Sequence, residues 1–374
     1  FFVFDFLDVP NLRFPEFKGE WEDKKLGDLC SEFKSGKNIK SAEILEDGKF
    51  PVFGGNGLRG FTHKYNYNGE YVIVGRQGAL CGNVRLVEGK CYMTEHAIVI
   101  QGSEDNNTKF LLYLLDKLNL GQYSDQSAQP GLAVNKLQKI KVTIPNLSEQ
   151  NKIASFLFLL DQRIKTQIKI IEDLKVLQNT LIDYYYHHQR YDKNVSLFDC
   201  ISQTSERNKK NNAFPVLSVS NKYGFIQQIE QFENRKVASE DISNYKIVRK
   251  NDFAYNPARI NVGSIAKLIK YSNGIVSPMY ICFRAKDNFL PDFLEFYFKS
   301  KQFKNEVLKR LEGSVRQCLP FEGLCDIPVV FPPKEKQKDI ITQLSAIQTK
   351  IEIETTIKEL QLKQKQHLLH QMLI

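Results

Sequence analysis

The chain has 374 residues, of which 42% are hydrophobic and 25% charged. It is too long for one ordinary domain, and it suits two domains of about 100 to 150 residues with connecting structure. No uninterrupted apolar stretch reaches the roughly 18 residues that a membrane helix requires. The composition therefore argues against a membrane protein and predicts a soluble, globular one.

Fifty-two lysines and arginines against 43 acidic residues leave a net charge of +9, which suits a polyanionic partner but is explained equally well by solubility. Residues 191–333 hold 21 basic and 15 acidic residues, whereas residues 11–147 hold 18 and 16. The seven cysteines form no C-x-x-C pair, which favours free thiols in a reducing cytoplasm over a zinc site. Residues 1–10 are apolar but lack a basic start, so they are not typical of a secretory signal.

In chain order, the pattern predicts two globular domains that alternate with two long helices. Their boundaries are 11–147 for the first domain, 148–190 for the first helix, 191–333 for the second domain and 334–374 for the second helix.

Within the domains, short apolar runs between turn residues predict a mixture of strands and short helices, which is an α+β class of fold. Strands are expected at 71–74, 97–100 and 140–144, turns at 54–57 and 66–69, and helices at 110–118 and 291–301.

Each long helix carries an apolar stripe at steps of three, four and seven residues, with no Gly or Pro inside it. About 42 residues at 1.5 Å per residue span roughly 63 Å, which is more than a surface helix of a small domain needs. Two such stripes most simply cover each other in an antiparallel coiled coil, and the alternative is that each helix packs on its own domain. The stripes are Ile153, Leu157, Leu160, Ile164, Ile168, Ile171, Leu174 and Leu181, then Ile340, Leu344, Ile347, Ile351, Ile357, Leu360 and Leu368.

The chain contains an internal duplication. A constant offset in residue number, 187, relates Ile144-Pro145 to Phe331-Pro332 and Glu149-Gln150 to Lys336-Gln337. Upstream the offset drifts to 171 between residues 26–28 and 197–199, and to 164 between residues 50–52 and 214–216. The two domains are therefore expected to share a frame, related by a pseudo-twofold repeat, and to differ in their loops.

The usual catalytic motifs are missing from the sequence. No G-x-x-x-x-G-K-[ST] phosphate loop occurs, which argues against an ATP-driven motor. Asn256-Pro257 resembles the start of the N-P-P-aromatic motif of adenine methyltransferases, but the second proline and the aromatic residue are absent. The six histidines lack the spacing and carboxylate neighbours of a metal nuclease. We therefore expect a non-catalytic chain without a cofactor or metal of its own.

Glycine-rich polar loops instead offer side chains that suit base edges and phosphates, although solvated loops and closed hairpins have the same composition. In the first domain the candidate DNA-binding residues are Lys37, Asn56, Arg59, Lys64, Arg76, Gln77 and Asn83. In the second domain they are Lys209, Lys210, Asn221, Lys222, Tyr223, Asn256, Arg259, Asn261 and Arg316. Gln126 and Gln129 are weaker candidates, because their place before the repeated joint also suits a structural role.

The sequence contains the runs Leu12-Arg13-Phe14-Pro15-Glu16-Phe17, Gly19-Glu20-Trp21 and Leu26-Gly27-Asp28, and both joints read proline-then-Glu/Lys-Gln-x-x-Ile. Through these motifs the chain resembles the specificity (S) subunits of type I restriction-modification systems. The resemblance covers essentially the whole chain.

The resemblance implies two target-recognition domains that read a split, asymmetric DNA sequence, with the helices as a ruler between them. It implies two methyltransferase subunits and ATP-dependent restriction subunits as partners, which would carry S-adenosylmethionine, ATP and Mg²⁺. Glu354, Lys358 and Gln361 interrupt the second apolar stripe, where they either soften the coil or face a methyltransferase subunit.

Two other functions remain open at this point: a coiled-coil scaffold whose basic loops are merely solvated, and a DNA-binding regulator without a methyltransferase partner. Steep loss of DNA affinity with rising salt separates a DNA reader from a scaffold.

Overall fold

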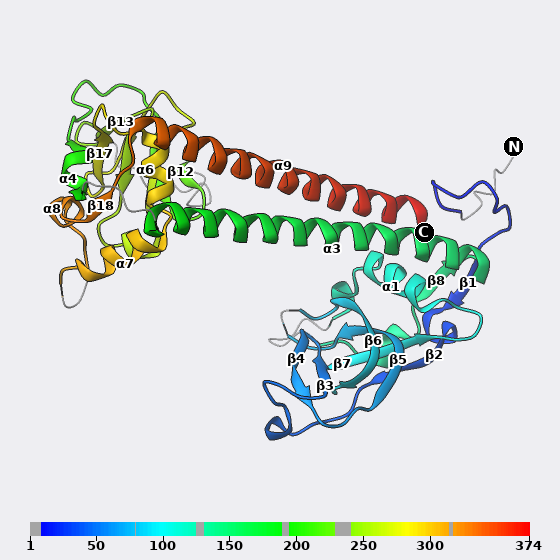
Figure 1. Ribbon diagram of the computed structural model, residues 1–374. Coiled ribbons are helices and arrows are strands. Elements are labelled where there is room, and N and C mark those ends of the chain that lie inside the picture. The colour runs from blue at the N-terminus through cyan, green and yellow to red at the C-terminus, as the bar shows by residue number, and fades with distance from the viewer. Residues whose placement is uncertain (1–8, 79, 125–130, 189–193, 229–240, 314–316) are drawn as a thin grey trace, which may run out of the picture. The chain divides into compact units, whose positions relative to one another are not determined.

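The computed structural model describes residues 9–78, 80–124, 131–188, 194–228, 241–313 and 317–374. It divides the chain into two compact units, each with one mixed α/β domain and part of the two longest helices (Figure 1). Unit 1 comprises Phe1–Ile168 and Thr356–Ile374, and unit 2 comprises Lys169–Thr355. Among the described residues, no helix combines the length and the apolar character needed to cross a membrane.

The domain of unit 1 is built on a six-stranded sheet in the order β2-β7-β5-β6-β3-β4. Neighbouring strands are antiparallel except β3 and β6, which run parallel. Side chains alternate along β5, so Val72 and Val74 face the main core while Ile73 faces a smaller one. The strands are β2 (Cys30–Ser35), β3 (Phe50–Gly54), β4 (Gly57–Thr62), β5 (Tyr67–Gly75), β6 (Val84–Met93) and β7 (Ala97–Gly102).

Two long helices and α1 (Thr108–Lys117) close the main core of unit 1. Asn107 caps α1, because its side chain accepts a hydrogen bond from the backbone N–H of Phe110. The first part of α3 (Leu147–Asp183) and the last part of α9 (Lys334–Met372) contribute Leu157 and Leu369 to this core. Smaller elements are β1 (Glu22–Lys25), η1 (Leu26–Leu29), η2 (Ser41–Glu43), η3 (Leu120–Tyr123), α2 (Val134–Leu137) and β8 (Lys141–Ile144).

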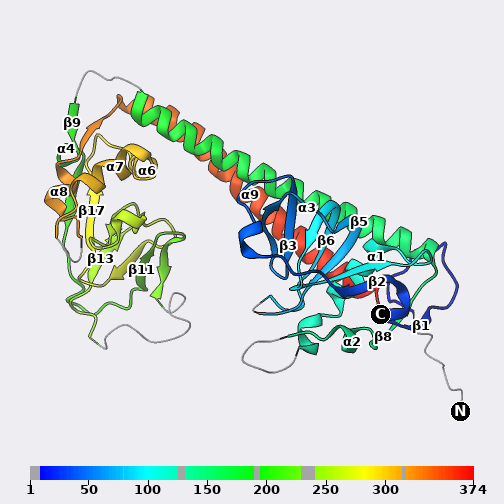
Figure 2. The same cartoon turned by 90° about the horizontal axis from the view of Figure 1, so that it is seen from below.

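The described part of unit 2 holds two four-stranded sheets, in the orders β10-β17-β14-β15 and β12-β11-β16-β13, and the pair β18-β9 (Figure 2). Strands β11 and β16 run parallel, as β3 and β6 do in unit 1. The strands are β9 (Asn194–Ser196), β10 (Ile201–Thr204), β11 (Val216–Ser220), β12 (Gly224–Gln227), β13 (Lys246–Arg249), β14 (Phe253–Tyr255), β15 (Ile265–Lys267), β16 (Asn273–Val276), β17 (Ile281–Ala285) and β18 (Pro328–Val330).

The helix predicted at 291–301 is confirmed at its start but ends early, because α6 (Pro291–Tyr297) is followed by a separate helix, α7 (Lys301–Lys309). Ser300 is extended and its side chain accepts a hydrogen bond from the backbone N–H of Phe303, so it starts a new helix. The other helical elements are η4 (Tyr184–His188), α4 (Leu197–Cys200), η5 (Ile260–Val262) and α8 (Phe321–Cys325).

The predicted duplication is confirmed in the order of elements. The succession β1-η1-β2 is repeated as β9-α4-β10, and α2-β8-α3 is repeated as α8-β18-α9. Helices α3 and α9 begin at Leu147 and Lys334, which are related by the same constant offset as the joints. The bounds predicted for the strands at 97–100 and 140–144 and for the helix at 110–118 agree within two residues with β7, β8 and α1. The strand predicted at 71–74 lies inside the longer β5, which begins four residues earlier.

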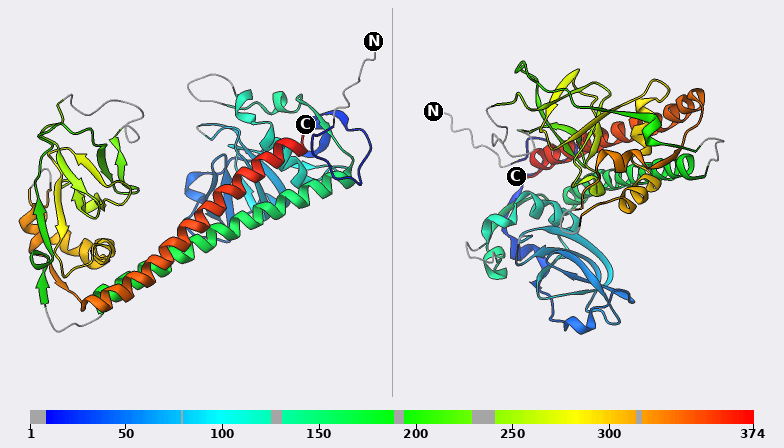
Figure 3. Two further views of the ribbon diagram at one scale, coloured as in Figure 1. Left: turned by 90° about the horizontal axis from the view of Figure 1, so that it is seen from above. Right: turned by 90° about the vertical axis from the view of Figure 1, so that its left-hand side faces the viewer.

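In each unit, a segment of α3 and a segment of α9 run side by side in opposite directions (Figure 3). The predicted stripes are only partly right, because Ile168 and Leu360 are 42% and 59% exposed. Steps of three and four from Ile164 instead reach the buried Gln167 and, further along, the buried Gln178. A single face of α3 is therefore covered, and it includes polar residues that a search for apolar residues overlooks.

Candidate nucleic-acid interface

Two β-hairpins that carry candidate residues occupy equivalent places in the two domains. The β3–β4 turn carries Asn56, with Arg59 following on β4, and the β11–β12 turn carries Asn221, Lys222 and Tyr223. In both domains the first strand of the hairpin pairs in parallel with its other neighbour, β6 or β16. The hairpins are therefore equivalent in topology, whereas the side chains at their tips differ.

A second equivalent pair of loops follows β5 and β14. The backbone N–H of Leu132 donates to the carbonyl of Arg76 at 2.9 Å, and that of Leu319 donates to the carbonyl of Pro257 at 3.0 Å. Leu132 and Leu319 are themselves related by the constant offset of the duplication. The loop with Arg76 and Gln77 therefore corresponds to residues 256–261, which hold three other candidates.

A third pair of loops follows β2 in unit 1 and β10 in unit 2. Lys37 follows β2, and Lys209 and Lys210 follow β10. Asn208 is fully buried, and its side chain bonds the backbone N–H and carbonyl of Asn212 at 3.0 and 3.1 Å. These bonds close the loop and leave both lysines exposed on it.

In unit 1, the candidate loops gather around the short connection between β6 and β7. The backbone N–H of Lys37 donates to the carbonyl of Met93, and that of Arg76 donates to the carbonyl of His96, each at 3.0 Å. Nδ1 of His96 lies 3.2 Å from Oε1 of Gln77. Residues that are distant from one another in the sequence are thus held on one small surface.

Glycines allow these loops to pack closely on one another. A Cβ at Gly55 would lie 2.7 Å from the carbonyl oxygen of His96, and a Cβ at Gly75 would lie 2.4 Å from that of Leu80. Gly78 differs, because it has a left-handed φ of +83° and no other heavy atom lies within 4 Å of the position that a Cβ would take. Gly55 and Gly75 therefore bring protein loops together, and Gly78 shapes an open turn.

Two arginines lie against the β3–β4 hairpin. The Arg59 side chain covers Gly54, where a Cβ would lie 2.7 Å from its Cδ, and the Arg85 guanidinium lies 3.3 Å from the Cβ position of Gly57. Arg85 is exposed and was missed by the sequence reasoning. It belongs to β6, and the whole of β5 separates it from the hairpin in the sequence, so no local pattern places it there.

Ion pairing distinguishes the candidates of unit 1. Lys64 Nζ lies 2.9 Å from Oε1 of Glu43, and this hydrogen bond is the main cause that raises the lysine pKa. Within the described residues, Lys37, Arg59 and Arg76 have no carboxylate partner. Their positive charge is available to a ligand, whereas that of Lys64 is already neutralised. Asn83 is exposed at the end of the turn that follows β5.

The loop after β14 in unit 2 is shaped by Asn256. Its side chain is 7% exposed, and its amide oxygen accepts a hydrogen bond from the backbone N–H of Ala258 at 3.1 Å. This bond holds the turn that leaves Arg259 and Asn261 exposed. Arg316, Gln126 and Gln129 lie outside the described residues.

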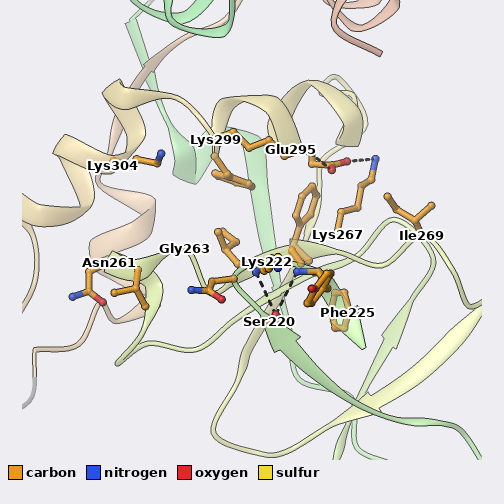
Figure 4. Close-up of a pocket in the computed structure, with 18 of the residues that line it drawn as sticks. Ser220, Lys222, Phe225, Asn261, Gly263, Lys267, Ile269, Glu295, Lys299 and Lys304 are labelled. Carbon is orange, nitrogen blue, oxygen red and sulfur yellow. Dashed lines mark hydrogen bonds and ion pairs between the residues drawn. The ribbon is translucent and has the colours of Figure 1, made fainter. Parts of the chain in front are cut away.

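Unit 2 also contains a lysine pocket of about 810 Å³, formed between the β11–β12 hairpin, β15, α6 and α7 (Figure 4). We define it by its five lysines, which are Lys222, Lys267, Lys270, Lys299 and Lys304. The candidates Asn221, Tyr223 and Asn261 line it as well. Four of the residues proposed from the sequence, Lys222 among them, therefore share a concave surface with four lysines that the sequence did not point to.

The cysteines are free thiols. Burial raises the pKa of Cys30, Cys200 and Cys282 to about 12, which keeps these thiols protonated and unreactive at neutral pH. In the part of the chain that the structure describes, no three His, Cys, Asp or Glu side chains come together as a metal site requires.

Each domain is joined to its long helix by a buried glutamine. Gln150 donates to the carbonyl of Pro145 at 2.9 Å and accepts from the backbone N–H of Asn107, the cap of α1, at 3.0 Å. Gln337 donates to the carbonyl of Pro332 at 3.0 Å, and it accepts from the backbone N–H that precedes α6 at 3.1 Å. The duplicated Pro–Gln spacing is thus a hydrogen-bonded joint that fixes a domain helix to the start of α3 or α9.

The N-terminal motif fastens residues 12–17 to the same joint in unit 1. Arg13 makes two hydrogen bonds of 2.7 Å to Glu149, which is completely buried. The Phe14 ring contacts Phe156 edge to face, and the backbone N–H of Leu12 donates to the carbonyl of Gln371 near the end of α9. The Leu-Arg-Phe-Pro run is therefore an attachment of the N-terminal segment to both long helices.

The architecture is that of a duplicated mixed α/β protein, in which two domains with equivalent loops are each fixed to a long helix. Comparison with known proteins then identifies the family. The family of the type I restriction modification DNA specificity domain matches residues 18–175 and 199–363, which is most of the chain. The chain belongs to this family.

Individual relatives agree with the family. The chain is 41% identical over 150 residues to the specificity subunit of the type I restriction enzyme EcoprrI of Escherichia coli. This aligned region covers 39% of this chain and 37% of that protein. It is 23% identical to the MjaVIII specificity subunit of Methanocaldococcus jannaschii, over 95% of this chain and 92% of that protein. The matching regions of the first relatives span little more than a third of their length.

A solved structure shares the fold. The S subunit of a type I restriction-modification system from M. genitalium superposes with a TM-score of 0.66 and 15% identity, covering 98% of this chain and 99% of that one. A second chain, from a study of complex assembly in the type I system, gives a TM-score of 0.54 over 93% of this chain and 96% of that one.

Proposed function

We propose that this chain is the DNA specificity subunit of a type I restriction-modification complex, and that it reads an asymmetric, bipartite target with one half per unit. The observation that carries the proposal is the recurrence of three candidate loops at equivalent places in both domains. Equivalent placement gives both domains the same way of approaching a duplex. Different residues in these loops give the two halves different sequences to read.

The side chains on these loops suit recognition of a duplex. Arg59 and Arg76 offer guanidinium groups that can bond both acceptors of guanine, and Gln77 offers an amide that can bond adenine in the same bidentate way. In unit 2, Arg259 and Asn261 offer the same two chemistries. Base-edge contacts specify the sequence, and the exposed loop lysines add contacts to phosphate that do not.

The long helices are proposed to form one antiparallel coiled coil that separates recognition domains at 11–147 and 191–333, with spacer helices at 148–190 and 334–374. Gln178 Nε2 lies 3.1 Å from Oε1 of Gln348 in unit 2, and Lys365 pairs with Asp161 at 2.6 Å in unit 1. The separation of Asp161 from Gln178 along α3 equals that of Gln348 from Lys365 along α9. Each unit by itself thus has the register that one continuous coil requires.

The polar residues of the second helix take part in this coil in the proposal. Glu354 is 7% exposed and pairs with Lys350 on the same helix at 2.5 Å, and the side chain of Lys365 is 20% exposed. Buried polar residues at such positions fix the register of a coiled coil at the expense of stability. Softening of the coil is therefore favoured over a direct role of Glu354 in holding a methyltransferase subunit.

The chemistry is assigned to partners in this proposal. Two methyltransferase subunits would bring S-adenosylmethionine, and restriction subunits would bring ATP and Mg²⁺, while this chain binds DNA and positions them. Among the described residues, Arg76 and Arg259 lie on equivalent loops without a carboxylate partner. A scaffold that does not bind DNA would not account for this recurrence, so the recognition function is favoured.

The proposal is tested by expressing the chain with a methyltransferase subunit of the same system and mapping adenine methylation across the host genome. We expect one asymmetric, split motif that disappears when the chain is omitted. A complex that is assembled and folded yet methylates no defined motif would contradict the proposal.

Variants of single loops sharpen the test. Arg76→Ala is expected to relax the methylated motif in one half only, and Arg259→Ala in the other half only, each by about 1–3 kcal/mol of discrimination. Lys139→Ala is a matched control, because Lys139 is exposed in unit 1 between α2 and β8, outside the candidate loops. Equal relaxation of both halves by one variant would contradict the assignment of one half to each unit.

A further inference from the structure

The charges in the lysine pocket of unit 2 do not cancel. Glu295 is the one acid among the described residues that line it, and it holds two of the five lysines. Its Oε2 lies 2.8 Å from Nζ of Lys267, and its Oε1 lies 3.1 Å from Nζ of Lys299. Lys267 pairs with Asp292 as well, and its side chain is 3% exposed. These two lysines therefore belong to a closed ion-pair network at the wall of the pocket.

The other three lysines, Lys222, Lys270 and Lys304, are exposed. Within the described residues none of them has a carboxylate partner, and Lys222 and Lys270 lie 4.9 and 5.6 Å from the ring centroids of Tyr223 and Tyr271. The three come from the β11–β12 turn, the segment after β15 and helix α7. Figure 4 labels Lys222 and Lys304 among them. The fold thus brings three uncompensated ammonium groups to one concave surface from three distant parts of the sequence.

We propose that the lysine pocket is a binding site for the phosphodiester backbone of DNA, in which Lys222, Lys270 and Lys304 contact phosphates and read no bases. This inference rests on the proposed function and adds residues to it, because Lys270 and Lys304 lie outside the candidate loops. A lysine is a flexible point charge that suits a phosphate oxygen, whereas bidentate recognition of a base favours arginine.

A comparison of the two units supports this division of labour. The unpaired cations gathered at the β3–β4 hairpin and β5 loop of unit 1 are the arginines Arg59, Arg76 and Arg85. Those of the pocket in unit 2 are all lysines. Unit 2 has Arg259 on the loop equivalent to that of Arg76, so base discrimination is expected from the candidate loops of both units and salt-dependent affinity from the lysines of the pocket.

The chemistry of the lining favours a nucleic-acid strand over a small anion. Tyr223, which is 66% exposed, and the exposed Asn261 both line the pocket, so an aromatic ring and an amide accompany the three charges. A free nucleotide shares this phosphate chemistry, so the experiment must compare the two sources. Lys222 belongs to the hairpin of the proposed function, and the test therefore uses Lys270 and Lys304.

The first measurement is the salt dependence of DNA binding by the full chain in complex with its methyltransferase subunit. Each lysine that contacts a phosphate contributes about 0.9 to the slope of log affinity against log salt concentration. The double variant K270Q/K304Q is expected to lower the steepness of this slope by roughly 1.8, with equal loss on target and scrambled duplexes. An unchanged slope, or a loss confined to the target sequence, would overturn the proposal.

Lys309→Gln is the matched control. Lys309 lies on the same helix α7, it is exposed, and it pairs with Glu306 at 2.6 Å outside the pocket. Its removal is expected to leave the slope unchanged. A slope change as large as that of a pocket variant would show a general effect of net charge and would overturn the assignment.

The second measurement identifies the occupant by lysine acetylation and mass spectrometry. Target and scrambled duplexes are expected to protect Lys270 and Lys304 from acetylation, whereas ATP or inorganic phosphate alone leaves them reactive. Protection by ATP without DNA would replace the proposal with a nucleotide site. If the complex binds duplexes without sequence preference but still protects these lysines, the specificity function fails while the backbone site stands.

Discussion

The buried glutamine at each joint gives the strongest test of the fold. Replacing Gln150 with Leu keeps a side chain of similar size but removes every hydrogen bond that the amide makes. The change leaves the carbonyl of Pro145, the backbone N–H of Asn107 and Oδ1 of Asn106 without a partner. Gln150 is 1% exposed, so water cannot replace these bonds without opening the joint.

The magnitude follows from the number of groups left unsatisfied. A buried donor or acceptor without its partner costs about 1–3 kcal/mol. We expect Gln150→Leu to lower the free energy of unfolding of unit 1 by about 3–5 kcal/mol, because three groups lose their partner. Gln337→Leu removes two bonds and is expected to lower that of unit 2 by about 2–4 kcal/mol.

The single tryptophan of the chain separates the two effects. Trp21 is buried in the core of unit 1, so its fluorescence during urea titration follows that unit. Gln150→Leu should move the fluorescence midpoint to lower urea, whereas Gln337→Leu should leave it in place and shift only the circular dichroism. Gln162→Leu, at an exposed position of the same helix α3, is the control for the change from Gln to Leu.

Destabilisation of unit 1 by less than about 1 kcal/mol in Gln150→Leu, the net contribution of one ordinary hydrogen bond, would show that the buried glutamine does not hold the joint. An equal effect of the Gln162→Leu control would show the same, since the loss of stability would then not come from the joint.

Other perturbations test particular contacts. Arg13→Met leaves the fully buried carboxylate of Glu149 unpaired and is expected to destabilise unit 1 by about 3 kcal/mol in the same titration; a shift below about 1 kcal/mol contradicts this. Burial acts to raise the pKa of Glu295, but the charges of Lys299 and Lys267 outweigh burial and lower the pKa below its ordinary value of 4.5. The ionised carboxylate therefore contributes fully to the stability of unit 2 well above pH 4.5, and this contribution is lost as the carboxylate protonates in more acid solution. Glu295→Gln should therefore make the stability of unit 2, followed by circular dichroism, fall less between pH 6 and 3 than in the wild type; an identical decline contradicts the ion pair. Gly75→Ala would place a Cβ 2.4 Å from a backbone carbonyl oxygen and should cost more than about 2 kcal/mol, with loss of sequence preference in one half-site.

The sequence predicts best where the physical cause is local or repeated. The helix boundaries follow from the prolines before each joint, and the joint itself follows from the constant offset between the two halves. The placement of candidate loops at turns was predictable as well, because Gly54, Gly55 and Gly57 are typical of a hairpin. These features can be predicted because each depends only on neighbouring residues or on a comparison of the two halves of the sequence.

The parts that sequence reasoning missed depend on contacts between distant segments. Arg85 reaches the hairpin from another strand, and the carboxylate that neutralises Lys64 comes from Glu43, 21 residues away. Asn256 is a candidate by residue type, and the hydrogen bond that its amide oxygen accepts from the backbone N–H of Ala258 could not be read from the sequence. The lysine pocket draws on a hairpin, a strand and two helices, so no window of sequence contains it.

The joint also explains why the two halves have diverged unevenly. Gln150 and Gln337 both bond a proline carbonyl and the backbone N–H at the start of a domain helix, and these groups are present whatever the domain side chains are. A joint of this kind constrains the length of chain around it and leaves the residues of the loops free to change. The offset therefore stays at 187 from Leu132 through the joint to the end of the helices, whereas it drifts to 171 and 164 in the segments that lead to the candidate loops. Two domains with unlike candidate loops and alike joints follow from that difference in constraint.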